Sequence, residues 1–309
     1  MTHRLLIDTD PGVDDALAIL MASAHPGCRI EALTITAGNV GLGHTLANAL
    51  KLCEVADIDA PVFPGAPVPL VAVPEDAAYV HGRDGFGDAG LSPPSRRAES
   101  EHAALAMLRL AREHPGELTF VMLGPLTNLA LALSLDPSLP ERVPRLVVMG
   151  GAVSGRGNTR LPVEFNTGFD PEAARIVFDR WPRFELVDWE ATLRHGLAHA
   201  RCDRWFAVDH PLARFYDTIS RQTRIWSAGL RGEEWHSADA LAMAQVLEPE
   251  RALETAERAL TVELAGEHAR GMTVVDWLGR GKRPVNARIL LSYDRTRFEQ
   301  LVQAAVGAA

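Results

Sequence analysis

Cysteine is scarce in this chain of 309 residues, and its spacing excludes two kinds of small protein. Cys28, Cys53 and Cys202 are odd in number, lie far apart and form no CxxC motif. A disulfide framework needs paired cysteines and a zinc knuckle needs closely spaced ones, so neither is expected. We expect three buried thiols instead.

Long apolar runs and a signal peptide are also lacking. Met1 to Arg4 lead directly into the first apolar segment, without the hydrophobic stretch and small-residue cleavage site of an export signal. No apolar run approaches the roughly 20 residues that cross a membrane. The sequence therefore predicts a cytoplasmic protein with no membrane partner.

Lysine is also scarce, and negative charge exceeds positive charge. Lys51 and Lys282 are the only lysines, arginine supplies nearly all of the positive charge, and the net charge is -9 at pH 7. Nucleic-acid binding needs clustered Lys and Arg against the phosphates. We therefore expect no nucleic-acid partner.

What the chain does contain is a regular alternation of short apolar runs and helical patterns. Its length and its hydrophobic content of 47% suffice for one large α/β domain or two smaller ones. The apolar runs that predict strands are 4–8, 29–37, 118–123, 146–149 and 184–187. The helical patterns between them are 13–24, 44–56, 100–114, 127–134 and 171–179. Continuous apolar strands separated by helices predict a doubly wound α/β fold, with a mostly parallel central sheet flanked by helices.

The remaining stretches interrupt this alternation without dividing the chain. No linker rich in Pro, Gly or Ser and no internal repeat marks a second folding unit, so we expect a single domain over 1–309. Helices are expected over 195–247, followed by strands near 259–264 and 288–293. The least regular stretch, 62–97, is rich in Pro and Gly. Loops of this kind are either lids or solvated surface loops. We predict a lid over 70–97.

Three carboxylates are packed into six residues after the first predicted strand. Asp10, Asp14 and Asp15 follow the apolar run 5–7, with a Pro-Gly turn between them. A strand that leads through a turn into a helix brings all three acids to one edge of the sheet. Like-charged carboxylates a few ångströms apart either retain a proton or bind a cation. The motif therefore predicts a metal site.

The other strand exits predict the rest of the site, because sheets of this kind bind ligands outside the carboxyl ends of their strands. The second exit carries Gly38-Asn39, the third runs from Leu123 to Asn128, and the fourth is Met149-Gly150-Gly151. Neither GxGxxG nor GxxxxGK[ST] occurs at these exits, so dinucleotides and P-loop phosphates have no support. A further segment offers amide and carboxylate acceptors suited to sugar hydroxyls: Asn158, Glu164 and Asn166.

Taken in order, several strings resemble the inosine-uridine-preferring nucleoside hydrolase family. They are Asp8-Thr9-Asp10-Pro11-Gly12-Val13-Asp14-Asp15-Ala16, Ala37-Gly38-Asn39, Gly124-Pro125-Leu126-Thr127-Asn128, Met149-Gly150-Gly151, Glu164-Phe165-Asn166 before Asp170-Pro171-Glu172-Ala173, and Ala269-Arg270-Gly271-Met272-Thr273-Val274-Val275-Asp276. They span most of the chain, and the first is highly specific. The resemblance implies a nucleoside hydrolase-like fold and Ca²⁺-dependent hydrolysis of the N-glycosidic bond of ribonucleosides to free base and ribose. It also implies a homo-oligomer, a dimer or a tetramer.

For the metal, the resemblance implies Ca²⁺ held by Asp10, Asp15, the backbone carbonyl of Leu123 and Asp239. A water and two ribose hydroxyls would complete the coordination. An all-oxygen, carboxylate-rich set independently favours a hard cation, and flexible coordination by about six to eight oxygens suits Ca²⁺ better than Mg²⁺.

For catalysis, the resemblance implies that the metal-bound water attacks the anomeric carbon and that Asp10 accepts its proton as general base. As in glycoside hydrolysis, the ribose would pass through an oxocarbenium-like transition state, whose charge a ring of acids stabilises. The implied substrate contacts are Asp14 with the 2′-hydroxyl, Asn166 and Asp239 with the 3′-hydroxyl, Asn158 and Glu164 with the 5′-hydroxyl, Asn39 under the sugar, and Met149.

On the base side, this chain departs from the family pattern. In one branch of the family a His precedes the last metal-binding Asp and protonates the departing base, another branch has Cys there, and this chain has Ala238. Contacts to the base are therefore expected from His81, in a string that also resembles the family, or from His236. The candidates for aromatic stacking are Trp226, Trp235 and Tyr216, for each of which ordinary packing is an equal alternative.

Two other functions fit parts of the sequence. Asp8-Thr9-Asp10 after an apolar strand also resembles the opening of haloacid dehalogenase-like phosphatases, but these need a phosphate-binding Lys or Arg, and Asp14-Asp15 would be unexplained. A non-catalytic ribose- or nucleoside-binding protein that retains the metal site is the second alternative, because Ala238 replaces the usual acid. The complete metal set around Asp10 favours hydrolysis.

Overall fold

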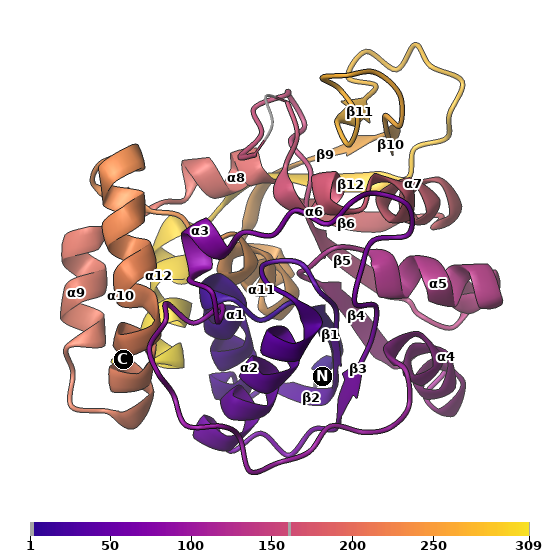
Figure 1. Cartoon of the computed structure of the whole chain (residues 1–309). Coiled ribbons are helices and arrows are strands. Elements are labelled where there is room, and N and C mark those ends of the chain that lie inside the picture. Colours follow the sequence, from indigo (N-terminus) through magenta and orange to yellow (C-terminus); the bar gives the residue numbers. More distant parts are fainter. Residues whose placement is uncertain (1–2, 160–161, 309) are drawn as a thin grey trace.

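The centre of the computed structural model is a sheet of eight strands in the order β3-β2-β1-β4-β5-β6-β12-β9 (Figure 1). The structure describes residues 3–159 and 162–308. Neighbouring strands run parallel except at one edge, where β9 pairs antiparallel with β12. The predicted α/β fold with a mostly parallel, helix-flanked sheet is confirmed.

Most of the expected elements form close to their predicted limits. The strands of the large sheet are β1 His3–Thr9, β2 Cys28–Ile35, β3 Val62–Pro64, β4 Leu118–Met122, β5 Arg145–Met149, β6 Phe184–Val187, β9 Ala252–Arg258 and β12 Ala287–Tyr293. The α-helices are α1 Val13–Ala24, α2 Leu42–Val55, α3 Ala78–His81, α4 Ala103–Glu113, α5 Thr127–Leu135, α6 Phe165–Phe169, α7 Pro171–Arg180, α8 Trp189–Arg194, α9 His199–Phe206, α10 Pro211–Arg231, α11 Ala238–Leu247 and α12 Arg295–Ala305. Within the described ranges, no helix has both the length and the apolar character needed to span a membrane.

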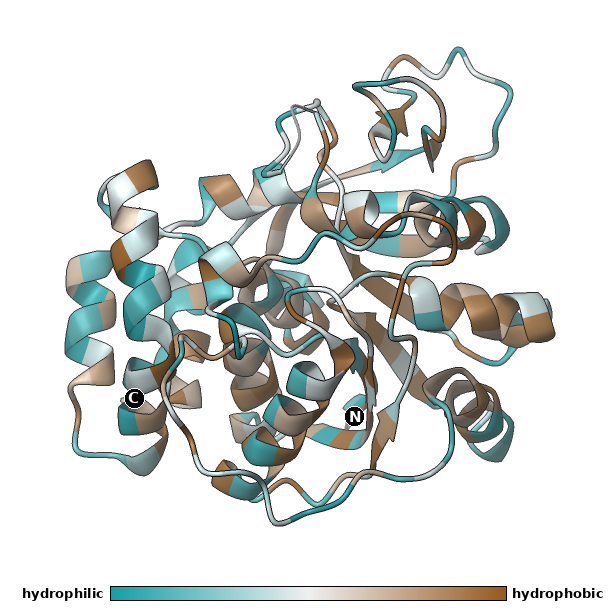
Figure 2. Cartoon of the chain, viewed as in Figure 1, coloured by the Kyte–Doolittle hydropathy of each residue, from teal (hydrophilic) through white to brown (hydrophobic). Residues whose placement is uncertain are grey.

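Strand β1 shows why the sheet is buried on both faces. Leu5 and Ile7 belong to one apolar cluster and Leu6 to the other, and all three are fully buried. Residues of α1, α2 and α11 complete the first cluster, and residues of α4, α5 and α7 complete the second. Figure 2 shows the resulting band of apolar residues along the sheet and the inner helix faces. Because the side chains on both faces of β1 are buried, its sequence is a continuous apolar run.

Five strands escaped the sequence analysis, namely β3, β7 Leu197–Ala198, β8 Glu234–Trp235, β9 and β11 Thr273–Val275. β3 and β11 have three residues each, too few for a periodic signal. β9 lies at the edge of the sheet, and Ala256 is its only buried residue, so it shows no apolar run. The strand expected near 259–264 forms as β10 Leu260–Val262, but it pairs with β11 in a separate two-stranded sheet. β7 and β8 pair with each other inside the stretch 195–247, so the expectation of helices alone is wrong for these two segments.

The stretch 70–97 is held in place at its helical part. It contains α3, which packs against α10. Gly82, Gly85 and Gly87 follow α3 with positive φ angles, a backbone region that residues with a Cβ rarely adopt. The role of 70–97 as a lid and the single-domain organisation over 1–309 stay predictions.

Candidate active site

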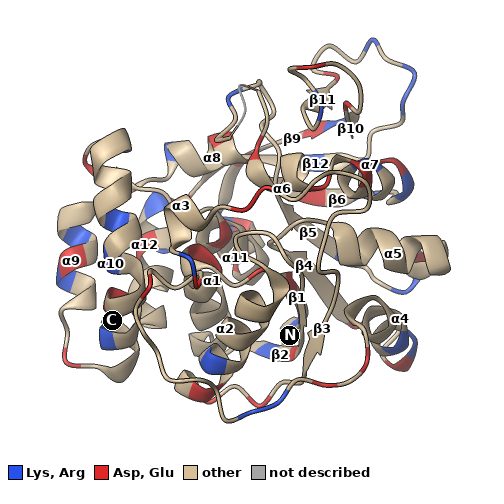
Figure 3. Cartoon of the chain, in the orientation of Figure 1, with Lys and Arg blue, Asp and Glu red and all other residues tan. Residues whose placement is uncertain are grey.

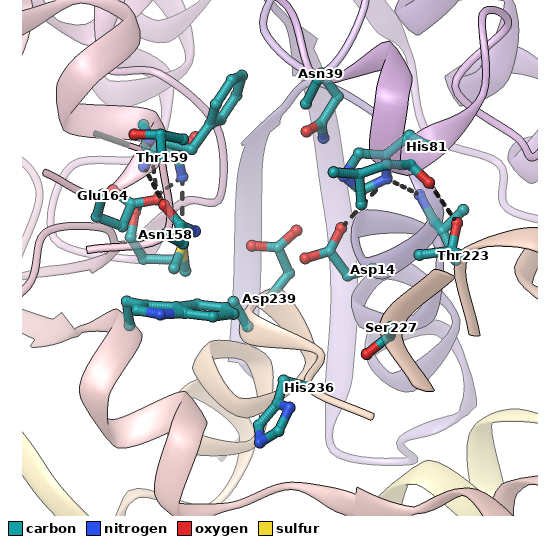
Figure 4. Close-up of a pocket in the computed structure, with 18 of the residues that line it drawn as sticks. Asp14, Asn39, His81, Asn158, Thr159, Glu164, Thr223, Ser227, His236 and Asp239 are labelled. Atoms are coloured by element: carbon teal, nitrogen blue, oxygen red, sulfur yellow. Dashed lines mark hydrogen bonds and ion pairs between the residues drawn. The ribbon is translucent and has the colours of Figure 1, made fainter. Parts of the chain in front are cut away.

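The polar strand exits meet at the carboxyl edge of the large sheet, as the sequence predicts, and line one pocket (Figure 4). Asp10 follows β1, Asn39 comes shortly after β2, Leu123 follows β4, and Met149 ends β5. Parallel strands place these exits side by side, so residues more than 100 positions apart share a wall of the pocket.

Two helix N-termini add carboxylates to this edge. Asp14 and Asp15 lie in the first turn of α1, Asp239 lies in the first turn of α11, and the two helices pack together. A carboxylate near a helix N-terminus is stabilised by the helix dipole, typically by about 0.3–1 kcal/mol. Figure 3 shows acidic residues gathered where α1 and α11 meet, whereas positive residues mark the outer helices α9 and α10.

Asp14, Asp15 and Asp239 form the tightest acidic group of the described residues. Each offers an oxygen, and these oxygens lie within 4.8 Å of one another. Burial, followed by the charges of Asp14 and Asp15, raises the pKa of Asp239 well above its usual value, and burial raises that of Asp14 to about 6. Asp14 Oδ1 is buried without a hydrogen-bond partner. Without a cation the group would hold protons near neutral pH, so a hard divalent cation fits it chemically.

Asp10 lies beside this group in a space that two glycines create. Its Oδ2 accepts a hydrogen bond from the Asn39 backbone N–H at 2.6 Å. A Cβ on Gly38 would lie 2.1 Å from Asp10 Oδ2, and one on Gly124 would lie 2.4 Å from Asp10 Oδ1. Both glycines are therefore required by the close approach of the carboxylate. Burial and the neighbouring Asp15 raise the pKa of Asp10 well above its usual value.

Asp15 is held more firmly than its neighbours. Its carboxylate accepts hydrogen bonds from the Thr9 hydroxyl, from the Gly12 backbone N–H at 3.0 Å and from Asn39 Nδ2 at 2.9 Å. Asn39 therefore ties Asp15 to Asp10. The resemblance placed Asp14 on the ribose and Asp10 on the metal, whereas the compact acidic group contains Asp14, with Asp10 adjacent to it.

Asn166 connects the exits of β4 and β5. Its Nδ2 donates to the Leu123 carbonyl at 2.7 Å and to the Met149 carbonyl at 3.3 Å. Leu123, Met149 and Asn166 all line the pocket. The Leu123 carbonyl, which is expected to bind the metal, thus lies at the predicted edge of the sheet and accepts one hydrogen bond from Asn166.

Glu164 and Asn158 form the opposite wall of the pocket, as Figure 4 shows. Glu164 caps α6 by accepting from the backbone N–H groups of Asn166 and Thr167, and it also accepts from that of Gly151. Burial raises its pKa to about 7. Asn158 Oδ1 accepts from the Phe165 backbone N–H at 2.8 Å.

His81 reaches the pocket from α3 and is neutral near pH 7. Its Nδ1 accepts the Val13 backbone N–H at 3.1 Å, so the ring proton is on Nε2. Burial lowers its pKa to about 4. His81 can therefore offer a hydrogen bond to a ligand, but it is not a ready source of a proton.

His236 and Trp226 also line the pocket, so the structure brings both base-side candidates to it. His236 Nδ1 is buried without a hydrogen-bond partner. Burial and the charge of Arg231 lower the pKa of His236. Of the remaining aromatic candidates, Trp235 lines the pocket, whereas Tyr216 is fully buried and donates its hydroxyl to the Val13 carbonyl at 3.0 Å. Tyr216 is a core residue.

Sequence reasoning missed a pair that lines the same end of the pocket, Trp189 and Arg231. The Arg231 guanidinium lies 4.5 Å from the centre of the Trp189 ring, and that ring lies 6.3 Å from the ring of His236. Trp189 follows the exit of β6, so the rule applied to the first four strand exits would have found it. Arg231, at the end of α10, has no comparable local signal.

Comparison with known proteins gives matches along the whole chain. The profile of the family described as inosine-uridine preferring nucleoside hydrolase matches residues 5–300. A pyrimidine-specific ribonucleoside hydrolase, RihB, of Escherichia coli is 32% identical over 307 residues, which cover 98% of this chain and 97% of the relative.

Solved structures match equally completely. A structure described as an inosine-guanosine nucleoside hydrolase superposes with a TM-score of 0.93 at 32% identity, with 100% of both chains covered. A purine-preferring ribonucleoside hydrolase from Gardnerella vaginalis gives a TM-score of 0.91 at 26% identity, with 98% of each chain covered. These proteins differ in the bases named for them, although their fold is shared.

Proposed function

The chain belongs to the inosine-uridine preferring nucleoside hydrolase family and is a nucleoside hydrolase, and from that premise we propose a Ca²⁺-dependent mechanism for the hydrolysis of its ribonucleosides. The products are the free base and ribose. The observation that carries the proposal is the compact group of Asp14, Asp15 and Asp239, of which Asp15 and Asp239 are buried, with the Asp10 backbone N–H 3.3 Å from Asp15 Oδ1.

Asp10, Asp15, Asp239 and the Leu123 carbonyl are the proposed ligands of Ca²⁺. Their donors are all oxygen, and three are carboxylates, as a hard cation requires. A bound Ca²⁺ supplies Lewis-acid polarisation, which makes a water molecule more acidic. Asp14 lies close enough to share this site. We assign its Oδ1, which has no hydrogen-bond partner and lies 3.9 Å from His81 Nδ1, to the ribose 2′-hydroxyl.

Asp10 is the proposed general base. As the oxygen of water bonds to C1′ and the bond from C1′ to the base nitrogen breaks, Asp10 accepts the proton that the water loses. Its burial makes the ionised carboxylate more basic than an exposed one. The remaining acids stabilise the positive charge that develops on the ribose. Asn39 holds Asp10 in position through its backbone N–H.

The sugar is proposed to lie between the acids and the Asn158–Glu164 wall. Asn166 and Asp239 contact the 3′-hydroxyl, Asn158 and Glu164 contact the 5′-hydroxyl, and Met149 packs against the ring. The convergence of these residues on one pocket supports the assignment.

The base is proposed to leave toward His81, Trp226 and Arg231. Because Ala238 carries no proton, the departing base must be stabilised by other means. The Nε2–H of His81 can donate to it, and the positive charge of Arg231 favours the negative charge that the base acquires. His236 remains the candidate proton donor. The homo-oligomeric state and the cytoplasmic location stay predictions from the sequence.

A panel of the common ribonucleosides, assayed for reducing sugar with and without Ca²⁺, tests the proposal. We expect release of ribose and free base that depends on Ca²⁺. Calorimetric binding of nucleosides without any release of base over hours would contradict it and favour a binding protein. Release of phosphate from an aryl phosphate would instead favour a phosphatase.

A further inference from the structure

A second cavity of about 410 Å³ lies next to the pocket of the proposed active site. One wall is the loop segment 72–76, which precedes α3, and the other is formed by α6 and the start of α7. Since one water needs only about 10–15 Å³ of such space, the cavity has room for a group of several heavy atoms.

The two cavities share a boundary. Tyr79, Thr159 and Phe165 line both of them. Phe165 is fixed at this boundary because its backbone N–H donates to Asn158 Oδ1 at 2.8 Å. Asn158 and Glu164 line only the first cavity, so the second one begins where the proposed function places the 5′ carbon of the ribose. Figure 4 shows Asn158, Thr159 and Glu164 together on this side of the pocket.

The walls of the second cavity combine apolar side chains with the two acidic residues Glu75 and Asp76. The Phe165 and Phe169 rings lie 5.8 Å apart, and Val163 and Phe169 are buried. Among its described lining residues, Arg270 carries the only positive charge, and that charge is compensated: Arg270 pairs with Glu172 at 2.7 Å and donates to the Leu264 carbonyl at 3.0 Å. These walls suit an apolar group better than an anion.

The loop that closes the cavity is fastened on both sides of it. The Leu70 backbone N–H donates to Asp170 Oδ2 at 2.9 Å, and the Ala77 backbone N–H donates to the Asn39 carbonyl at 2.9 Å. Asp170 also caps α7, so the loop is tied to the same helix that lines the cavity. The space is thus part of the folded structure.

We propose that this cavity is a substrate subsite that accepts an apolar substituent on the 5′ carbon of the ribose, such as an alkylthio group. The assignment rests on the proposed function, because that function places the 5′ carbon beside Asn158. The chain then hydrolyses 5′-alkylthio ribonucleosides as well as unsubstituted ones.

The test compares three forms of whichever ribonucleoside the enzyme hydrolyses best: the parent, its 5′-deoxy-5′-methylthio form and its 5′-monophosphate. Burial of the methylthio group offsets the lost 5′-hydroxyl contact, so kcat/KM for the methylthio form should lie within about tenfold of the parent. The monophosphate should be hydrolysed far less well than the methylthio form.

Variants that fill the cavity should change this selectivity. Ala72→Trp should lower the ratio of methylthio to parent kcat/KM by about tenfold or more, because the new ring occupies the space of the substituent. Val73→Trp, at a position that is 83% exposed, is a second filling variant that leaves the core untouched. Val71→Trp is the matched control, since Val71 is on the same loop but does not line the cavity, and its ratio should equal that of the wild type.

The outcomes separate the two proposals. No hydrolysis of any parent ribonucleoside would overturn the proposed function itself. Hydrolysis of the parent with none of the methylthio form, or an unchanged ratio in both filling variants, would overturn only the subsite. Preference for the monophosphate over the methylthio form would overturn its apolar character.

Discussion

The half of the pocket that we assign to the sugar and the half that we assign to the base are built from different kinds of structure; we call them the sugar half and the base half. The sugar half consists of strand exits and helix starts, and its acids Asp10, Asp15 and Asp239 are at most 3% exposed. The base half consists of the short helix α3, the end of α10 and the segment before α11. There Tyr79 is 60% exposed, and Trp226 and Arg231 are half-buried.

On the proposed assignment, the residues of the reaction are separate from those that select the base. The sheet fixes the groups that we propose act on the ribose, because each is attached to a strand or helix that the core holds. The base would meet peripheral elements that can change without disturbing that core. Related hydrolases named for pyrimidines, for inosine and guanosine, or for purines accordingly occur within one family and fold.

Replacing the proposed base should have the largest effect. Asp10→Asn should lower kcat by about 10²- to 10⁴-fold or more for every nucleoside, because general base catalysis is lost whichever base departs. Ribose release by steady-state assay measures it, with circular dichroism to check folding. Asp59→Asn, an exposed acid, is the control. Retention of more than a few per cent of activity would remove Asp10 from this role.

Removal of the cation should abolish turnover almost as completely. A chelator should stop release of base from purine and pyrimidine nucleosides alike, because the acids Asp15 and Asp239 serve only the sugar half. Added Ca²⁺ should restore the activity. Restoration by Zn²⁺ in preference to Ca²⁺ would contradict the preference of an all-oxygen set for a hard ion.

Loss of the positive charge at the base end should have a moderate effect that depends on the base. Arg231→Met should reduce kcat by about tenfold, equivalent to about 1.4 kcal/mol, since the half-buried guanidinium acts on the leaving group through a partly solvated medium. Arg221→Met, on the exposed side of the same helix, is the control. An equal reduction for all bases would show that Arg231 acts on the sugar or on folding.

The stability of the metal-free protein should fall as pH rises, whereas the effect of Ca²⁺ should grow. Burial raises the pKa of Asp14 to about 6 and that of Glu164 to about 7. These groups hold protons in the folded state that the unfolded state has released, so their contribution is full below about pH 4 and is lost by about pH 7. Because Ca²⁺ displaces protons, its Kd is weaker at pH 5 than at pH 8. The stabilisation at one fixed Ca²⁺ concentration, about 2.7 kcal/mol where that concentration is 100 times Kd, should therefore be smaller at pH 5 than at pH 8. Thermal unfolding with and without Ca²⁺ measures this, and a pH-independent shift would contradict it.

The smallest expected effect is that of His236→Ala. If His236 protonates the base, the variant should slow purine nucleosides by a few-fold more than pyrimidine nucleosides, since purines depend more on protonation. The comparison of kcat for inosine and uridine measures it. Equal rates for both would assign His236 to packing against Trp189.

Much of the fold and of the sugar half follows from local sequence. The apolar run of β1, the Asp10 to Asp15 motif and the glycine-rich exits each report on a segment that is buried or turned in a particular way. Glycine at positions 38 and 124 is explained by the carboxylate of Asp10 between them. Asp239 was expected only through the resemblance, because nothing in its neighbourhood distinguishes it from other helical acids.

The sequence by itself therefore determined a parallel α/β sheet with acids at the end of its first strand. Tertiary structure alone decided that Asp239 joins Asp15 across the contact of α1 with α11, that Arg231 covers Trp189, and that a second cavity adjoins the first. Local patterns encode burial and turns along one segment. Contacts between distant segments depend on how helices pack, and such packing leaves no local trace.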